Sequence, residues 1–140
     1  MALVTSLERV NQLFAERIDE VLRPLDLTFA RYEVLRLLAF TREGRMPMAR
    51  MGALLQVHPT SVTSAVARLE KQGYVERLKD ADDGRVVLAT ITPSGRVIVE
   101  KATDGLNEGV FAAAFLDAGE LEGLLELLTA LRRNAGDIGD

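Results

Sequence analysis

The sequence of 140 residues contains no cysteine and a single histidine, His58. The lack of cysteine excludes disulfide bonds, thiolate metal sites and a thiol-based redox sensor. With one histidine, a transition-metal site would have to be built mostly from carboxylates, which is an uncommon donor set. We therefore expect no metal and no cofactor.

Long apolar runs and catalytic motifs are also missing. No stretch of about 18 apolar residues is available to span a membrane, and the N-terminal residues lack the basic and apolar regions of a signal peptide. No G-x-x-x-x-G-K loop, no H-E-x-x-H motif and no second histidine is present, which argues against an enzyme. With 48% hydrophobic and 27% charged residues, the composition is that of a globular protein, which we expect in the cytoplasm.

Charge is distributed unevenly along the chain. The whole sequence has a net charge of −4, but residues 31–101 contain 12 Lys/Arg and 8 Asp/Glu, whereas the two flanking segments contain 5 Lys/Arg and 13 Asp/Glu. A basic centre between acidic ends suits a protein whose middle contacts phosphate and whose ends contact something else. The alternative is an uneven scatter of surface charge without a partner.

The spacing of apolar residues predicts four helices in the first half of the chain. The first covers 7–22 and ends before Pro24, and the second begins after Thr28, which can cap it. A turn around Gly44 precedes a short helix over 47–55. Pro59 then starts a helix that runs to about residue 72, with Gly73 as its stop.

A β-hairpin and two further helices are predicted in the second half. The hairpin pairs strands over 74–79 and 85–91 around a polar tip. Thr92 and Pro93 start a helix that runs to about residue 115, in which Gly105 and Gly109 require close packing or a bend to offset their low helix propensity. Asp117 caps a last, leucine-rich helix, and residues 134–140 are expected to fray.

This order of elements predicts a mainly α (α+β) fold, a winged helix-turn-helix in one domain over 1–140. Residues 28–92 would form a DNA-binding lobe. The outer helices, over 1–24 and 93–135, carry apolar stripes that a monomer would leave partly exposed, so we expect them to form a homodimer.

The helix from Pro59 carries the residues that we expect to contact double-stranded DNA. Its inner face is apolar, whereas small hydroxyl side chains near its start can enter a major groove and bond to base edges or phosphates. The alternative is that these hydroxyls are only solvated. The predicted contacts on this helix are Thr60, Ser61, Thr63, Ser64, Arg68 and Lys71.

Two further positions flank this helix. His58 lies just before it, where capping, a phosphate contact or plain exposure are all open. At the hairpin tip, Arg85 can enter a minor groove while the nearby Asp83 holds its guanidinium in place, although an ordinary charged turn has the same composition. A small-molecule pocket at the junction of the lobe and the outer helices could involve Phe14, Phe29, Tyr32 and Arg36, but side chains of these types are more often core.

In this order and spacing, the motifs at 27–28, 32–38, 58–64, 68–75, 83–85 and 91–95 resemble the multiple antibiotic resistance regulator (MarR) family over nearly the whole chain. The resemblance implies a homodimeric transcriptional regulator, usually a repressor, on pseudo-palindromic DNA. It implies recognition helices in successive major grooves, a wing arginine in a flanking minor groove, and release of DNA by a small aromatic effector.

The chain also departs from that family. Many members carry arginine where this chain has Ser64, so one DNA contact is expected to be missing. Smaller capping residues are commoner than His58, and the cysteine of the peroxide-sensing branch is absent. The main competing function is a winged helix that binds only protein, which the acidic net charge favours and the hydroxyl-rich helix opposes.

Overall fold

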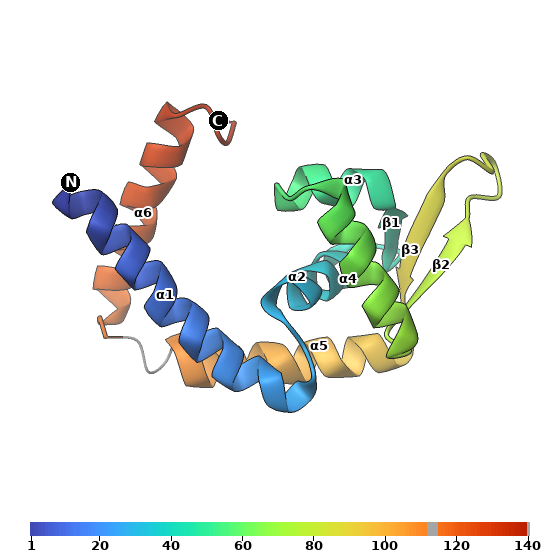
Figure 1. The fold of residues 1–140 in the computed structure, drawn as a ribbon, viewed down its shortest axis with the longest axis horizontal. Coiled ribbons are helices and arrows are strands. Elements are labelled where there is room, and N and C mark those ends of the chain that lie inside the picture. Colours follow the sequence, from blue (N-terminus) through green and yellow to red (C-terminus); the bar gives the residue numbers. More distant parts are fainter. Residues whose placement is uncertain (112–114, 140) are drawn as a thin grey trace.

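The computed structural model describes residues 1–111 and 115–139, and it confirms a winged helix-turn-helix with long outer helices (Figure 1). Helices α2, α3 and α4 and a small sheet form a lobe at one end of an elongated molecule, while α1, α5 and α6 make up the rest. The elements are α1 (Ala2–Leu22), a 3₁₀ turn (Arg23–Leu25), α2 (Phe29–Phe40), β1 (Arg45–Pro47), α3 (Met48–Leu55), α4 (Pro59–Lys71), β2 (Val75–Lys79), β3 (Val87–Ile91), α5 (Pro93–Leu106), a π-helical turn (Asn107–Phe111) and α6 (Ala118–Asn134).

The core of the lobe lies where α2, α4 and the sheet meet. Leu35 and Leu38 of α2 and Val66 and Leu69 of α4 are fully buried, as the apolar spacing of both helices predicted. Each such side chain contributes roughly 1.5–3 kcal/mol by leaving water. This core fixes the angle at which α4 presents its outer face.

The sheet has three antiparallel strands in the order β1–β3–β2. The predicted hairpin is present as β2 and β3, with Val75 opposite Ile91 and Lys79 opposite Val87. Strand β1 was not predicted, because residues 41–45 were interpreted as a turn that leads directly into a helix. Its three residues are too few to show alternation, and β1 exists because the buried Met46 pairs with Ala89 of β3.

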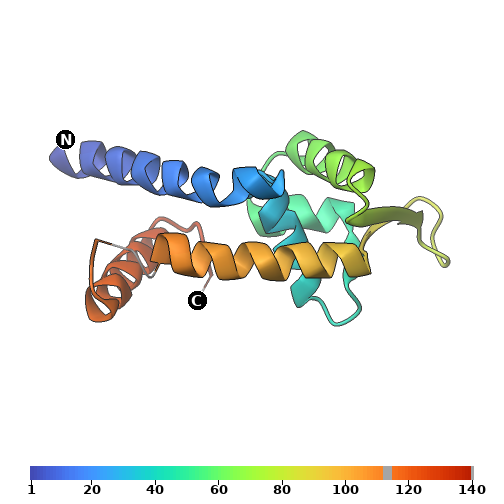
Figure 2. The ribbon, with the colours of Figure 1, turned by 90° about the horizontal axis from the view of Figure 1, so that it is seen from below.

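Helices α1 and α5 pack against each other, and α5 runs below the lobe in the view of Figure 1; Figure 2 shows both helices extending from the lobe towards the same end of the molecule. A Cβ added at Gly105 or Gly109 would lie 3.0 or 2.7 Å from a methyl group of Val21, so of the two predicted alternatives, close packing or a bend, both glycines permit close packing. The predicted helix through residue 115 was wrong in its length. Helix α5 ends at Leu106, a π-helical turn follows, and residues 112–114 lie outside the described residues.

Except at its C-terminal end, helix α6 lies apart from the lobe; its ribbon overlaps that of α1 in Figure 1, but Figure 2 shows the two helices separated. Asp117 caps it as predicted, in a capping box in which Glu120 bonds back to the Asp117 amide. None of its residues is buried, and Leu7 and Val10 of α1 are likewise exposed. The apolar stripes of both helices are therefore accessible. Of the helices described, none has the length and apolar character to cross a membrane.

The predicted fraying of residues 134–140 is wrong for residues 134–139. Gly136 adopts a left-handed φ of 73°, and the chain folds back so that Asp137 receives a bond from the Arg132 guanidinium at 2.6 Å. Gln56, at the end of α3, bonds both Asp137 (3.0 Å) and Arg132 (2.9 Å). These polar contacts tie the end of α6 to the turn before α4, which periodicity cannot reveal.

Candidate nucleic-acid interface

Helix α4 begins with two residues that define its start. His58 is the N-cap, and its Nδ1 accepts a hydrogen bond from the Thr60 amide at 3.1 Å. Pro59 follows at the first helical position, where its missing N–H costs nothing. Of the roles left open for His58, the geometry supports capping, and capping requires Nδ1 to be unprotonated.

The outer face of α4 is polar and exposed along its whole length. The inner face is fixed by the buried Val62, Val66 and Leu69, so the opposite side chains point to solvent. The Thr63 hydroxyl donates to the Pro59 carbonyl at 3.0 Å, which leaves its lone pairs free to accept. The predicted DNA contacts that share this exposure are Thr60, Ser61, Thr63, Ser64, Arg68 and Lys71.

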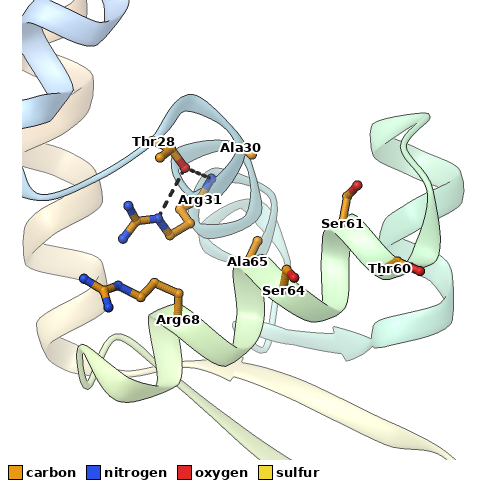
Figure 3. A pocket seen from close by; sticks show the side chains of 8 residues that line it. All are labelled: Thr28, Ala30, Arg31, Thr60, Ser61, Ser64, Ala65 and Arg68. Atoms are coloured by element: carbon orange, nitrogen blue, oxygen red, sulfur yellow. Dashed lines mark hydrogen bonds between the residues drawn. The ribbon is translucent and has the colours of Figure 1, made fainter.

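A groove runs between the start of α2 and α4, and we name it the α2–α4 groove (Figure 3). It has a volume of about 390 Å³ and brings four predicted contacts together with two polar residues that were not predicted to face DNA, Thr28 and Arg31. The lining residues are Thr28, Ala30, Arg31, Thr60, Ser61, Ser64, Ala65 and Arg68.

Arg31 is held at this groove by its own helix start. The Thr28 oxygen caps α2 by accepting from the Arg31 amide at 3.3 Å, and it also accepts from the Arg31 Nε at 3.2 Å. A second nitrogen of the guanidinium bonds Gln72, the residue after α4, at 2.9 Å. The sequence revealed Thr28 as a cap, but nothing in it indicated that Arg31 would turn towards α4.

The wing tip between β2 and β3 carries the second group of predicted contacts. The Asp83 carboxylate accepts from the Arg85 amide at 3.1 Å and from its Nε at 3.2 Å. These hydrogen bonds lower the pKa of Asp83. The Arg85 side chain is 93% exposed, so it is oriented but not covered. In Figure 1 the wing tip points away from α4, and the two groups of predicted contacts remain separate.

A paired arginine and glutamate connect α4 to the wing. Arg77 of β2 donates to the Glu70 carboxylate through Nη2 at 2.9 Å, through Nε at 3.3 Å and through its amide at 3.2 Å. The side-chain hydrogen bond from Arg77 is the main reason that the pKa of Glu70 is lowered. Because the pair is formed by ionised Glu70, its contribution is present at neutral pH and is lost as the pH falls through the lowered pKa.

A second cavity of about 390 Å³, which we name the α2 pocket, lies at the junction of the lobe and the outer helices. Of the four side chains named as possible pocket residues, Phe29, Tyr32 and Arg36 line this cavity, although Tyr32 is also part of the buried core, and Phe14 lies in a separate small cavity beside α1. The Arg36 guanidinium stacks over Phe40 at 4.2 Å. The remaining lining residues are Ile18, Glu33, Leu37, Leu55, Leu106 and Asn107.

The α2 pocket contains a carboxyl group in an unfavourable environment. Partial burial raises the pKa of Glu33. Nearby, the Tyr32 hydroxyl bonds Thr103 of α5 at 2.9 Å and so joins the lobe to the outer helices. A ligand in this pocket would therefore contact both parts of the molecule.

Comparisons with known proteins agree with this geometry. The sequence profile of the MarR family matches residues 27–87. A MarR family transcriptional regulator of Streptomyces coelicolor, Sco5413, superposes with a TM-score of 0.90 at 43% identity, over 100% of this chain and 97% of that one.

Two further proteins are similar over most of their length. A mutant of MarR from Escherichia coli in complex with operator DNA has a TM-score of 0.79 at 29% identity, and the match covers 94% of each chain. The transcriptional regulator SarZ of Staphylococcus saprophyticus is 31% identical over 113 residues, which are 81% of this chain and 75% of SarZ.

Proposed function

The chain belongs to the MarR family of transcriptional regulators, and on this premise we propose that it binds a pseudo-palindromic operator as a homodimer and represses transcription there. The observation that best supports DNA binding is the outer face of α4, where four hydroxyl side chains are exposed and not covered by the rest of the described chain. Small hydroxyls let a helix approach base edges closely; all four can accept, and those of Thr60, Ser61 and Ser64 can also donate. The operator complex of the Escherichia coli MarR mutant supports DNA as the partner.

The outer face of α4 also suggests which segments bind DNA and which form the dimer. Residues 28–92 form the lobe that contacts DNA, and residues 1–24 and 93–135 form the dimer. Two copies related by a twofold axis would place their α4 helices in major grooves about 34–36 Å apart. The exposed apolar stripes of α1 and α6 supply the surface that the second copy would cover.

A footprint on the DNA upstream of the protein's own gene tests this proposal. Protection of two half-sites about 10 base pairs apart is expected, in two successive major grooves. Binding to a protein partner with no affinity for any duplex, even at low salt, would instead identify a protein-interaction module.

Replacing Arg85 by alanine should weaken DNA binding about tenfold without lowering stability, because the side chain is almost fully exposed and each dimer has two wings. Fluorescence anisotropy with a labelled operator measures the affinity. Arg9→Ala is the matched control, since Arg9 is an exposed arginine of α1, distant from the wing. Equal affinities of the Arg85→Ala variant and the wild type would remove the wing from the interface.

We further propose that a small aromatic effector binds in the α2 pocket and releases the operator. The pocket is mostly apolar, is built on the aromatic rings of Phe29 and Tyr32, and offers the Arg36 guanidinium to an anionic substituent. An effector acts by binding one spacing of the two lobes better than another. The bond between Tyr32 and Thr103 lies beside the pocket and would respond to such a change.

The affinity for an aromatic carboxylate should rise as the pH is lowered from 7 to about 4.5, the ordinary pKa of glutamate, because Glu33, whose pKa is raised, is then mostly protonated and stops repelling the ligand. Titration calorimetry with a panel of aromatic acids measures this. In a Glu33→Gln variant the affinity should be high and nearly independent of pH. A wild-type affinity that is unchanged over this pH range would exclude Glu33 as a neighbour of the ligand.

The same raised pKa affects stability. The folded state holds the Glu33 proton more tightly than the unfolded state does, so the group favours folding at low pH, and this contribution is lost as the pH rises through the folded pKa. Urea unfolding of the Glu33→Gln variant should therefore show a gain over wild type at neutral pH that vanishes near pH 4.

A further inference from the structure

The α2–α4 groove contains a feature that recognition by the α4 hydroxyls does not explain. Two guanidinium groups, Arg31 from α2 and Arg68 from α4, lie at the same end of the groove (Figure 3). The two arginines are 37 positions apart in the sequence, and no carboxylate is among the residues that line the groove. A concave surface with two arginines and several hydroxyls has the chemistry of an anion site.

An internal anion already lies at this end of the groove. The Asp26 carboxylate is 3.7 Å from the Arg68 guanidinium, and the Asp26 carbonyl accepts from Arg31 at 3.0 Å. Gln72 bonds the same carbonyl at 2.7 Å and the carboxylate at 3.3 Å. The backbone of Asp26 is thus fixed, whereas its side chain is 72% exposed and can be displaced from Arg68.

We propose that the α2–α4 groove binds a backbone phosphate of the DNA duplex, with Arg31 and Arg68 as its contacts and Asp26 as a built-in competitor. This inference rests on the proposed function, because the groove opens beside Ser61 and Ser64 on the face of α4 that would enter the major groove. A phosphate there belongs to the strand that borders that groove. The Asp26 carboxylate opposes it twice, by pairing with Arg68 and by repelling the phosphate.

The Asp26→Asn variant isolates this competition. Asparagine has the same shape, and it tolerates the left-handed conformation that Asp26 adopts, at a φ of 53°. The variant should therefore fold normally and bind DNA about three- to tenfold more tightly at low salt, since one unfavourable charge per groove is removed. The probe is a fluorescein-labelled duplex of mixed sequence, about 30 base pairs long, because a phosphate contact needs no particular sequence.

Variants of the two arginines show whether a change in DNA affinity comes from a contact in the groove or from a general change of charge. Arg31→Gln should lower the affinity about three- to tenfold and should flatten the slope of log affinity against log salt between about 50 and 200 mM. In an Arg68→Gln background, the gain from Asp26→Asn should be smaller than in the wild type, because only the repulsion between the carboxylate and the phosphate then remains.

Glu43→Gln is the matched control. Glu43 also pairs with an arginine, Arg45, at 2.9 Å, but it follows the other end of α2. The variant changes the net charge by the same amount and should leave the affinity within about twofold of wild type. Thermal unfolding followed by circular dichroism verifies that each variant is folded. If Asp26→Asn does not fold, Arg31→Gln still tests the proposal.

Each outcome has a defined meaning. Affinity of Asp26→Asn equal to wild type, an equal gain in Glu43→Gln, or a gain that is undiminished without Arg68 would overturn the phosphate site and leave the proposed function intact. An Arg31→Gln variant with the affinity and salt slope of the wild type would overturn it too. If neither the wild type nor any variant binds a duplex at low salt, the proposed function is wrong, and the phosphate site is wrong with it.

Discussion

A Gly95→Ala variant is expected to lose about 2–4 kcal/mol of unfolding free energy, although glycine-to-alanine changes inside helices usually stabilise. Gly95 lies in the first turn of α5 and is buried. An added Cβ would press against the Tyr74 carbonyl oxygen and lie 2.8 Å from Cγ1 of Ile91. The Tyr74 carbonyl cannot move away freely, because it accepts the Thr92 amide at 3.0 Å.

Urea unfolding at a fixed protein concentration measures this loss. The matched control is Gly123→Ala in α6, where an added Cβ meets no atom within 4 Å. That variant should gain about 0.5–1 kcal/mol, because alanine restricts the unfolded chain and favours the helix. Indistinguishable midpoints for Gly95→Ala and Gly123→Ala would contradict the close approach of α5 to Tyr74.

A Leu128→Glu variant should be monomeric at micromolar concentration and should bind the operator more than about 100-fold more weakly than wild type. Leu128 lies at the centre of the apolar stripe of α6, which also contains Leu121, Leu124, Leu125 and Leu131. In a twofold dimer the substitution would place two glutamates, one from each copy, in the interface. Burying these carboxylates without partners would cost the dimer several kcal/mol of stability. Losing the dimer also removes the second recognition helix, and with it the high effective concentration at the second half-site.

Analytical ultracentrifugation and anisotropy measure the two effects. Ala130→Glu is the control, because it adds the same charge to an exposed position on the opposite side of α6. It should remain dimeric and should bind DNA normally. A Leu128→Glu protein that stays dimeric with unchanged affinity would exclude this stripe of α6 from the interface, and with it the proposed use of residues 93–135.

Local patterns predicted most of the fold, because caps and apolar spacing are local signals. Thr28, Thr92 and Asp117 are all N-caps in the structure, with side chains that accept from the amide three residues on. Strand β1 and the π-helical turn after Leu106 were missed, because each depends on a partner distant in sequence or on a one-residue change of helical register. Their positions follow from tertiary packing.

The residues of the candidate site also fall into those that the sequence could predict and those that depend on tertiary packing. The hydroxyls of α4 were predictable because a helix with one apolar face must expose the other. The position of Arg31 could not be predicted, because it depends on how α2 crosses α4. Its partners Asp26 and Gln72 are not part of any recognisable sequence motif. The pairing of Glu70 with Arg77 was missed for the same reason.

The contact of Val21 with Gly105 and Gly109 lies far from the wing, and Figure 2 shows the wing continuing beyond the start of α5. From Gly105 to Pro93, α5 rises about 18 Å, and a five-residue strand of the wing adds about 16 Å. A tilt of α5 by about 5° at its contact with Val21 therefore shifts the wing tip by about 3 Å. That shift is close to one base-pair step of the duplex. In the proposed dimer, bulkier side chains at either glycine should therefore misalign the two lobes relative to the half-sites without altering any of the proposed DNA contacts.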